Sequence, residues 1–484
     1  MSEKVNVLLM GGGGREHALA MKIAESPRLG EFYTTHGENP GIAALAMPVD
    51  VPVSIREAYR LQQFIEKRRI GLVVIGPEDP LAEGFADKLR SPACRVFGPT
   101  RAGAQLEADK AWSKQLMRGA LIPTGDARVF GDAESARAYV ESRASDDLVL
   151  REVIEKASLL RDPADRRASI DAQRRERKDV RASYDAHRED LPVIKAAGLA
   201  KGKGVFLPSS LREAIDVIDR IMVRREFGDA GQRVVIEERL TGREVSVLAI
   251  TDGSSLLVLP PTQDHKRLGD GDTGPNTGGM GAFCPAGTVS DDVMARTERD
   301  VLVPVLDALR REGIDYRGVL YAGLMLTHAG PRVLEFNCRF GDPECQAILP
   351  RLKSDLLELL IAACDGRLAE APVEWDDRSA CCVVLAAEGY PENPKKGVPI
   401  TGVETASAMP DVLVFHAGTR RTPEGALVTN GGRVLNVVAL GETLETARAK
   451  AYEAASAIGF AGKVMRSDIG ATTEPVNPRG AARR

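Results

Sequence analysis

Short apolar runs alternate with amphipathic stretches over the first hundred residues. The runs Val5–Met10, Ile70–Ile75 and Val96–Phe97 are each followed by glycine, and a helical pattern extends from Glu16 to Ala24. Brief apolar runs that end at glycine or proline are typical of buried strands. Because strands that alternate with helices pair in parallel, this part of the sequence predicts a parallel sheet.

A charged segment at about residues 145–190 interrupts this pattern. Both signs of charge are mixed along it, and it holds no glycine or proline from Ala164 to Asp190. Such a composition predicts a long solvated helix or a partly disordered insertion. It is either an arm that binds a partner or a passive surface insertion.

Strand patterns resume after this segment. They fall at Pro192–Ala196, Arg233–Glu237 and Glu244–Ile250. Gly318–Thr327 and Arg332–Phe336 flank a His-Ala-Gly-Pro turn and therefore predict a β-hairpin.

Further strands are predicted near the end of the chain. The runs Cys381–Ala387, Val412–Ala417 and Arg433–Leu440 alternate with glycine turns, which indicates a small β-rich region. The polar tail after Gly470 predicts a loose end.

Composition narrows the class of protein. The 484 residues are 43% hydrophobic and 28% charged, and the net charge of −4 gives no polybasic footprint for nucleic acid or membrane. No apolar run approaches the roughly 20 residues that a membrane helix needs, and no signal peptide precedes the first strand. Seven cysteines without a Cys-x-x-Cys spacing predict reduced thiols in a cytoplasmic protein.

Two glycine-rich segments follow predicted strands. Gly11–Gly14 stands at a strand-to-helix junction, where backbone N–H groups can bind an anion, and Glu16 replaces the third glycine of a dinucleotide fingerprint. We expect a phosphate-bearing small molecule there; a tight structural turn is the alternative. Lys195–Val205 lacks the end of a P-loop, but a glycine loop with lysines can close over a triphosphate. A charged surface hairpin is the alternative.

Carboxylates follow two other strand patterns. Glu78 lies at the carboxyl end of a parallel strand, the edge where open α/β sheets bind ligands, and is a candidate for ribose hydroxyls. A proline-braced turn is the alternative. Glu237 and Glu238 end a run that is typical of an edge strand, which can present backbone groups to adenine and a carboxylate to ribose. An exposed, solvated pair is the alternative.

The segment Leu334–Glu344 carries the most specific local signal. Alternate side chains of a strand share a face, so Glu335, Asn337 and Arg339 are expected to point one way, with apolar neighbours on the other side. Two oxygen ligands and a guanidinium suit Mg²⁺ bound to phosphates beside a gripped anion. A structural ion pair of Glu335 with Arg339 is the alternative.

A polar segment, Gln263–Gly281, predicts a long ligand-binding loop without regular structure. His265 within it is either a base or only a hydrogen-bond donor.

These segments, in this order, resemble the phosphoribosylamine–glycine ligases of the ATP-grasp superfamily. The matching motifs include GGGGREHAL, GPEDPLA, AQLEADK, GLAKGKGV, VIEERLTGREVS, QDHKR, GPNTGGMGA, LEFNCRFGDPE and TNGGRVL. The resemblance extends from Val5 to about Gly470, apart from the charged segment. It implies an α/β fold with an N-terminal parallel-sheet (pre-ATP-grasp) domain, an ATP-grasp core with a small mobile lid, and a small β-rich C-terminal domain.

The resemblance also implies domain boundaries. The phosphoribosylamine domain is expected at 1–105, the linker and lid with the charged segment at 106–240, and the catalytic domain at 241–375. The C-terminal domain is expected at 376–472, and the tail at 473–484.

The implied reaction is the ATP-dependent ligation of glycine to 5-phosphoribosylamine through glycyl phosphate, in de novo purine synthesis. ATP is then a substrate and Mg²⁺ or Mn²⁺ the cofactor, and we expect a cytoplasmic monomer that binds neither nucleic acid nor membrane. Another ATP-grasp enzyme of purine metabolism acting on a different amine or acid is the main alternative. A biotin-carboxylase-type enzyme and a non-catalytic nucleotide-binding regulator are the others.

The resemblance assigns roles motif by motif. Glu335 and Asn337 correspond to metal ligands, Arg339 to the group that binds the glycine carboxylate and acyl phosphate, and Asp264 to a partner of the glycine amine. The implied nucleotide-binding residues are Lys110, Lys195, Glu237, Glu238, Arg239, Leu240, Glu244, Arg267 and Asn276. Lys110 and Lys195 resemble strand lysines that reach phosphates, and Lys195 is also counted as catalytic. The implied phosphoribosylamine pocket is Gly13, Gly14, Arg15 and Glu78.

The sequence departs from the family pattern at four places. The charged insertion before Leu191 is not a usual family feature, and we expect no direct catalytic role for it. Ala197 stands where many relatives carry aspartate, and Lys201 where they carry alanine. Residues 37–41 read Gly-Glu-Asn-Pro-Gly instead of Gly-Asn-Ala-Gly, so we expect the local pocket wall to differ from that of relatives.

Overall fold

A computed structural model describes residues 4–146, 191–200 and 203–471. The chain divides into two compact units. The large unit is drawn from Met1–Glu107, Leu116–Pro123 and Gly242–Arg484, and the small unit from Ala108–Gln115 and Thr124–Thr241. From residue 147 onward the predicted charged segment lies outside the described residues, as do Lys201 and the tail at 473–484.

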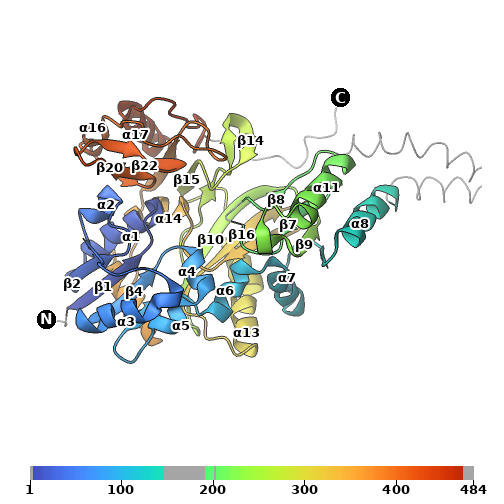
Figure 1. Cartoon of the computed structure of the whole chain (residues 1–484), viewed down its shortest axis with the longest axis horizontal. Coiled ribbons are helices and arrows are strands. Elements are labelled where there is room, and N and C mark those ends of the chain that lie inside the picture. Colours follow the sequence, from blue (N-terminus) through green and yellow to red (C-terminus); the bar gives the residue numbers. More distant parts are fainter. Residues whose placement is uncertain (1–3, 147–190, 201–202, 472–484) are drawn as a thin grey trace, which may run out of the picture. The chain divides into compact units, whose positions relative to one another are not determined.

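The large unit begins with the predicted parallel sheet, whose five strands have the order β3-β2-β1-β4-β5. Strands β2, β1 and β4 of this sheet are labelled in Figure 1. The strands are β1 (Val5–Met10), β2 (Leu29–Thr34), β3 (Met47–Pro48), β4 (Ile70–Ile75) and β5 (Arg95–Phe97). The helices are α1 (Gly14–Ala24), α2 (Pro40–Ala43), α3 (Ala58–Lys67), α4 (Glu78–Glu83), α5 (Phe85–Leu89) and α6 (Arg101–Ala108). Because β1 and β4 pair in parallel, the segments that follow both strands meet at one edge of the sheet.

The second sheet of the large unit is antiparallel, with the order β11-β10-β16-β17. Its strands are β10 (Arg243–Thr251), β11 (Leu256–Val258), β16 (Gly318–Thr327) and β17 (Gly330–Asn337). The predicted hairpin is confirmed, since Thr327 pairs with Gly330. The predicted alternation through Arg339 is wrong in detail: the register shifts at Leu334, which is only half-buried, and β17 ends at Asn337.

The third sheet combines two distant parts of the chain, with the order β12-β15-β18-β22-β19. Its strands are β12 (Gln263–Asp264), β15 (Gly281–Cys284), β18 (Ser379–Ala386), β19 (Val412–His416) and β22 (Arg433–Gly441). The small hairpins β13 (Arg267–Gly269) with β14 (Thr273–Asn276) and β20 (Thr419–Arg421) with β21 (Leu427–Thr429) lie outside it. The prediction that Gln263–Gly281 has no regular structure is therefore wrong, because strands occupy most of this segment.

Helices complete the large unit. They are α12 (Asp291–Thr297), α13 (Val303–Arg311), α14 (Glu344–Ile348), α15 (Leu356–Asp365), α16 (Val403–Ser407) and α17 (Leu444–Ala457). Among the described residues, no helix is both long enough and apolar enough to cross a membrane. All seven cysteines are free thiols, as the sequence predicts.

The small unit contains an antiparallel sheet with the order β6-β9-β7-β8. The strands are β6 (Ala127–Phe130), β7 (Val193–Ala196), β8 (Val205–Phe206) and β9 (Val234–Glu237), and the helices include α8 (Ala133–Asp146) and α11 (Leu211–Ile218). The prediction of an edge strand before Glu238 is wrong, since β9 has a neighbour on each side. Lys110 is not on a strand either: it begins helix α7 (Lys110–Gly119).

Candidate active site

The first glycine segment forms the turn from β1 into α1. Gly11 has a φ of +110°, and a Cβ there would lie 2.7 Å from the side chain of Glu16. Gly13 is the N-cap of α1, and its N–H donates to Glu16 Oε2 at 2.7 Å. The turn itself therefore requires glycine. It also places the amino end of α1, with Gly13, Gly14 and Arg15, at the expected edge of the sheet.

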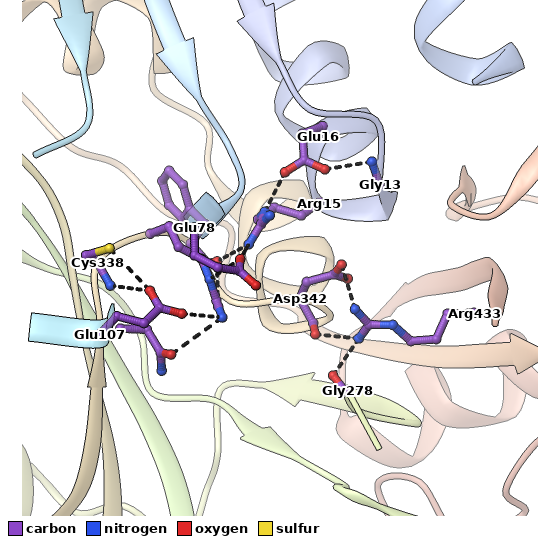
Figure 2. Close-up of polar contacts among 12 residues, drawn as sticks. Gly13, Arg15, Glu16, Glu78, Glu107, Gly278, Cys338, Asp342 and Arg433 are labelled. Carbon is purple, nitrogen blue, oxygen red and sulfur yellow. Dashed lines mark hydrogen bonds and ion pairs between the residues drawn. The ribbon is translucent and has the colours of Figure 1, made fainter. Parts of the chain in front are cut away.

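A chain of buried and partly buried charges extends from this turn to Arg339, two residues beyond the end of β17 (Figure 2). Arg15 Nε lies 2.6 Å from Glu16 Oε1, and Arg15 Nη1 lies 4.0 Å from Glu78 Oε2. The same Glu78 oxygen lies 3.2 Å from Arg339 Nε. Arg339 Nη2 in turn lies 2.9 Å from Glu107 Oε1. The structure therefore brings together Arg15, Glu78 and Arg339, which the sequence places in separate motifs.

Glu107 is a site residue that the sequence analysis missed. It is buried at the end of α6, and its Oε2 accepts a hydrogen bond from the Cys338 backbone N–H at 2.9 Å. It therefore fixes both the backbone at the end of β17 and the guanidinium of Arg339. Its motif, AQLEADK, was recognised, but a glutamate in a helical pattern gives no sign of burial against a strand more than 200 residues away.

The charges of this cluster favour a cationic or hydroxyl-bearing ligand. Burial alone would raise the pKa of the Glu78 carboxyl, but the guanidinium groups of Arg339 and Arg15 bring it down to about 2. Glu78 is consequently an anion at neutral pH. The cluster contains three carboxyl groups, those of Glu16, Glu78 and Glu107, but only two guanidinium groups. Its immediate surroundings therefore suit an amine or ribose hydroxyls better than a phosphate.

A second polar group lies beside the first turn of α1. Arg433 Nη2 pairs with Asp342 Oδ2 at 2.8 Å, and its Nη1 donates to the Gly278 carbonyl at 2.5 Å (Figure 2). Asn436 is 1% exposed, and within the described part of the chain both of its amide atoms lack a hydrogen-bond partner. A Cβ added at Gly14 would lie 2.1 Å from Asn436 Nδ2. Arg433 and Asn436 were also missed, because β22 approaches α1 only in the folded chain.

Asp264 lies in an acidic part of the large unit. Burial raises its pKa to about 7; the ammonium of Lys266 opposes this shift, whereas the carboxylates of Glu344, Glu244 and Glu335 add to it. Lys266 Nζ lies 3.4 Å from Glu244 Oε2. At neutral pH the Asp264 carboxyl is therefore poised between its two protonation states.

Glu344, which the sequence analysis did not single out, is fixed by two hydroxyl groups. The Tyr321 hydroxyl donates to Glu344 Oε1 at 2.6 Å, and the Ser246 hydroxyl donates to the same oxygen at 3.2 Å. Because Glu344 is buried and held in this way, its carboxyl group has a fixed position, and it is one of the groups that raise the pKa of Asp264.

The β13–β14 hairpin carries two expected nucleotide-side residues. Arg267 pairs with Asn276 across the hairpin, and Arg267 Nη1 donates to the Gly274 carbonyl at 2.8 Å. His265 precedes the hairpin, and burial lowers its pKa, so the imidazole is neutral at pH 7.

The small unit gathers the other expected nucleotide residues. Glu237 is 1% exposed at the end of β9, which excludes the solvated-surface interpretation for this residue. Lys195 Nζ lies 2.7 Å from Glu237 Oε2, and Lys114 forms a second ion pair with Glu237. Lys110 Nζ donates to the Gly198 carbonyl at 3.4 Å in the glycine loop. Arg239 and Leu240 follow β9, and Arg239 Nη2 donates to the Pro208 carbonyl at 2.7 Å.

Comparison with known proteins gives this geometry its context. Sequence models of phosphoribosylglycinamide synthetase match along the chain: the N domain at residues 5–107, the ATP-grasp (A) domain at 166–345 and the C domain at 380–472. A phosphoribosylamine–glycine ligase of Rhodopirellula baltica is 46% identical over 467 residues, which cover 96% of this chain and 97% of the relative. The chain belongs to the phosphoribosylamine–glycine ligase family. It is accordingly an ATP-grasp ligase, as the resemblance of its motifs implied.

Solved structures agree with this family fold. The crystal structure of phosphoribosylamine–glycine ligase from Thermotoga maritima matches with a TM-score of 0.73 and 33% identity, covering 96% of this chain and all of that one. The biotin carboxylase domain of Hydrogenobacter thermophilus 2-oxoglutarate carboxylase, solved with MgADP, matches with a TM-score of 0.67 at 13% identity, which indicates the shared ATP-grasp fold alone.

Members of the ATP-grasp family use ATP with a divalent metal, and the end of β17 fits such an ion. Glu335 and Asn337 lie opposite Gly323 and Tyr321 on β16, two residues apart and therefore on one face. Asn337 Oδ1 accepts from Arg339 Nη2 at 3.5 Å. The ion pairs of Arg339 with described residues are to Glu78 and Glu107, so the alternative of a structural pair with Glu335 is not observed.

The oxygen atoms of Glu335 and Asn337 also suit a hard cation such as Mg²⁺. The described residues hold no cluster of three or more His, Cys, Asp or Glu side chains suited to a metal. One carboxylate and one amide oxygen match a cation that takes its remaining ligands from phosphates and water, as Mg²⁺ commonly does.

Two departures from the family pattern have structural counterparts. Ala197 is buried, and its backbone carbonyl accepts from the Lys110 N–H at 2.8 Å, so this position joins α7 to the glycine loop. Asn39 caps α2, and its Nδ2 donates to the Gly12 carbonyl at 2.8 Å and the His416 carbonyl at 2.9 Å. The altered segment at 37–41 thus supports the first glycine turn.

Proposed function

We propose that this protein joins glycine to 5-phosphoribosylamine at the expense of ATP, giving glycinamide ribonucleotide, ADP and phosphate. The observation that carries the proposal is the end of β17, where Glu335, Asn337 and Arg339 follow one another beside the buried charges of Glu78 and Glu107. This arrangement occurs in a chain whose full-length relatives are named phosphoribosylamine–glycine ligases.

The reaction proceeds in two displacements. A carboxylate oxygen of glycine attacks the γ-phosphorus of ATP, and the bond to the ADP oxygen breaks to leave glycyl phosphate. The amine nitrogen of phosphoribosylamine then attacks the glycyl carbonyl carbon, phosphate leaves with the bonding pair, and the nitrogen loses a proton to solvent. The protein contributes mainly positioning and charge stabilisation.

Arg339 and Asp264 are assigned to glycine. The guanidinium of Arg339 is held on two sides by Glu78 and Glu107, which fixes its direction and leaves it suited to bind the carboxylate and then the acyl phosphate. Asp264, in its ionised form, accepts hydrogen bonds from the glycine ammonium. The acidity of its surroundings favours a cationic ligand at this point.

Gly13, Gly14, Arg15 and Glu78 are assigned to phosphoribosylamine. The excess of carboxylates around Glu78 supports contact with the amine and the ribose hydroxyls. The buried amide of Asn436 beside Gly14 supports a polar substrate group at the first turn of α1, since an unsatisfied buried amide is costly without a partner.

Nucleotide binding is assigned to the residues that the family resemblance implies. They are Lys110, Lys195, Glu237, Glu238, Arg239, Leu240, Glu244, Arg267 and Asn276. Glu335 and Asn337 hold Mg²⁺ or Mn²⁺, which when bound supplies positive charge to the terminal phosphates of ATP. The expected boundaries near residues 105, 240, 375 and 472 remain part of this proposal, as does a cytoplasmic location.

ADP release under controlled substrate supply tests the proposal. ADP should form only when glycine and phosphoribosylamine, generated in situ, are supplied together with ATP and Mg²⁺. Equal release with another amino acid in place of glycine would favour a different ATP-grasp ligase. No release with any acid and amine would favour a nucleotide-binding regulator.

A further inference from the structure

Two lysines of the small unit converge on one buried carboxylate. Glu237 pairs with Lys195 at 2.7 Å and with Lys114, and all three side chains are at least nine-tenths buried. Lys114 Nζ also donates to Thr124 Oγ1 at 2.6 Å. The role of Lys114 does not follow from the assignments made so far, because Lys110 and Lys195 already serve as the phosphate lysines.

The strand register explains why Lys195 reaches Glu237. Lys195 on β7 lies opposite Val235 on β9, and Glu237 lies opposite Val193, so Lys195 and Glu237 are diagonal neighbours on the same face of the sheet. Lys114 approaches from α7, one helical turn after Lys110. The carboxylate therefore has one ammonium from the sheet and one from a helix.

The presence of two ammonium groups beside Glu237 matters when Lys195 binds a nucleotide. An ammonium that turns to a phosphate must leave its carboxylate, and a buried carboxylate without a partner is strongly unfavourable. With Lys114 in place, Glu237 keeps an ion pair after Lys195 has left. Without Lys114, Lys195 is the partner that Glu237 retains.

We propose that Lys114 is a positioning residue that keeps Glu237 paired and so allows Lys195 to exchange this carboxylate for a phosphate of ATP. The inference rests on the proposed function, which assigns Lys195 to the nucleotide. Lys114 acts through this carboxylate, since its ammonium contacts Glu237 and Thr124.

Equilibrium binding of a non-hydrolysable ATP analogue with Mg²⁺ tests this exchange in the full-length protein. K114M should raise the Kd at least about tenfold, because Glu237 then retains Lys195. The double variant K114M/E237Q should bind within about threefold of E237Q alone, since a neutral amide no longer holds Lys195. Exposed Lys67 provides the matched control, and K67M should leave the Kd unchanged.

Neither E237Q nor K114M/E237Q contains a Glu237 carboxylate that could retain Lys195, so this comparison decides the matter even where K114M alone folds poorly. A double variant that binds much more weakly than E237Q would overturn the inference, because Lys114 would then contribute without Glu237. Wild-type affinity in folded K114M would overturn it as well. If K195M also binds normally, the assignment of Lys195 to the nucleotide fails too; if K195M binds weakly, only the role of Lys114 is lost.

Discussion

At the scale of single residues, the sequence predicts which side chains carry the chemistry of the site better than it predicts which residues those side chains contact. Glu335, Asn337 and Arg339 could be identified because they alternate within one sequence motif, although β17 itself ends at Asn337. Glu107, Lys114 and Asn436 could not be, because each gains its role from a residue far away in the sequence. Neither hydrophobic periodicity nor local spacing contains that information.

The titration of Asp264 provides a test at this scale. Its pKa is about 7 in the folded protein, against about 3.9 in an unfolded chain. Between these values the folded state binds more protons than the unfolded state. The contribution of Asp264 to stability therefore falls as pH rises, by at most about 1.4 kcal/mol per pH unit.

Replacing Asp264 by asparagine should remove this dependence. We expect the Tm of the wild type, relative to that of D264N, to decline from about pH 5 to about pH 7 and to level off above about pH 8. Thermal unfolding of both proteins without ligands measures the difference. A difference that is constant or that increases over this range contradicts the raised pKa.

At the scale of elements, the positions of the strands were predicted well, but the pairing of strands with one another was predicted poorly. Apolar runs mark β1, β4, β7, β9 and β10 to within a residue or two, because burial sets their composition. The prediction of β9 as an edge strand is wrong, since which strands lie beside it is a long-range property. The supposed loop at 263–281 forms the local hairpin β13–β14 and strand β12, which pairs with β15. Strand β15 in turn pairs with β18, about a hundred residues further along the chain.

The junction of β1 and α1 offers a test at the element scale. Alanine at Gly14 would place a Cβ 2.1 Å from Asn436 Nδ2, so the first turn of α1 or β22 must shift. We expect G14A to lose about 1–3 kcal/mol of stability through overpacking and to raise the KM for phosphoribosylamine more than that for ATP. Circular dichroism melts and steady-state kinetics measure the two effects.

Gly287 provides the control for this substitution, because a Cβ there meets nothing within 4 Å. G287A should retain the wild-type Tm and both KM values. Equal KM values for phosphoribosylamine in G14A and wild type would remove Gly14 from the substrate pocket.

At the scale of the whole molecule, identity follows from the order of motifs and not from any one of them. Each glycine turn or acidic strand end has a plain structural explanation, and the structure supports that explanation in part at Gly11 and Gly13. The series as a whole covers nearly the full chain, as does the match to the Rhodopirellula baltica relative, at 96% of this chain. The fold class was therefore predictable, whereas the pairing of charges within the site was not.

The central claim is that the carboxylate of Glu335 is essential for ATP-driven activation of glycine. ADP release by E335Q, with ATP, Mg²⁺, glycine and phosphoribosylamine at saturation, tests it most directly, with E374Q at an exposed position as the control. We predict that E335Q keeps the wild-type Tm but loses at least about a thousandfold in kcat, equivalent to about 4 kcal/mol of transition-state stabilisation, while E374Q is unaffected. A folded E335Q protein with kcat near that of the wild type would contradict the account.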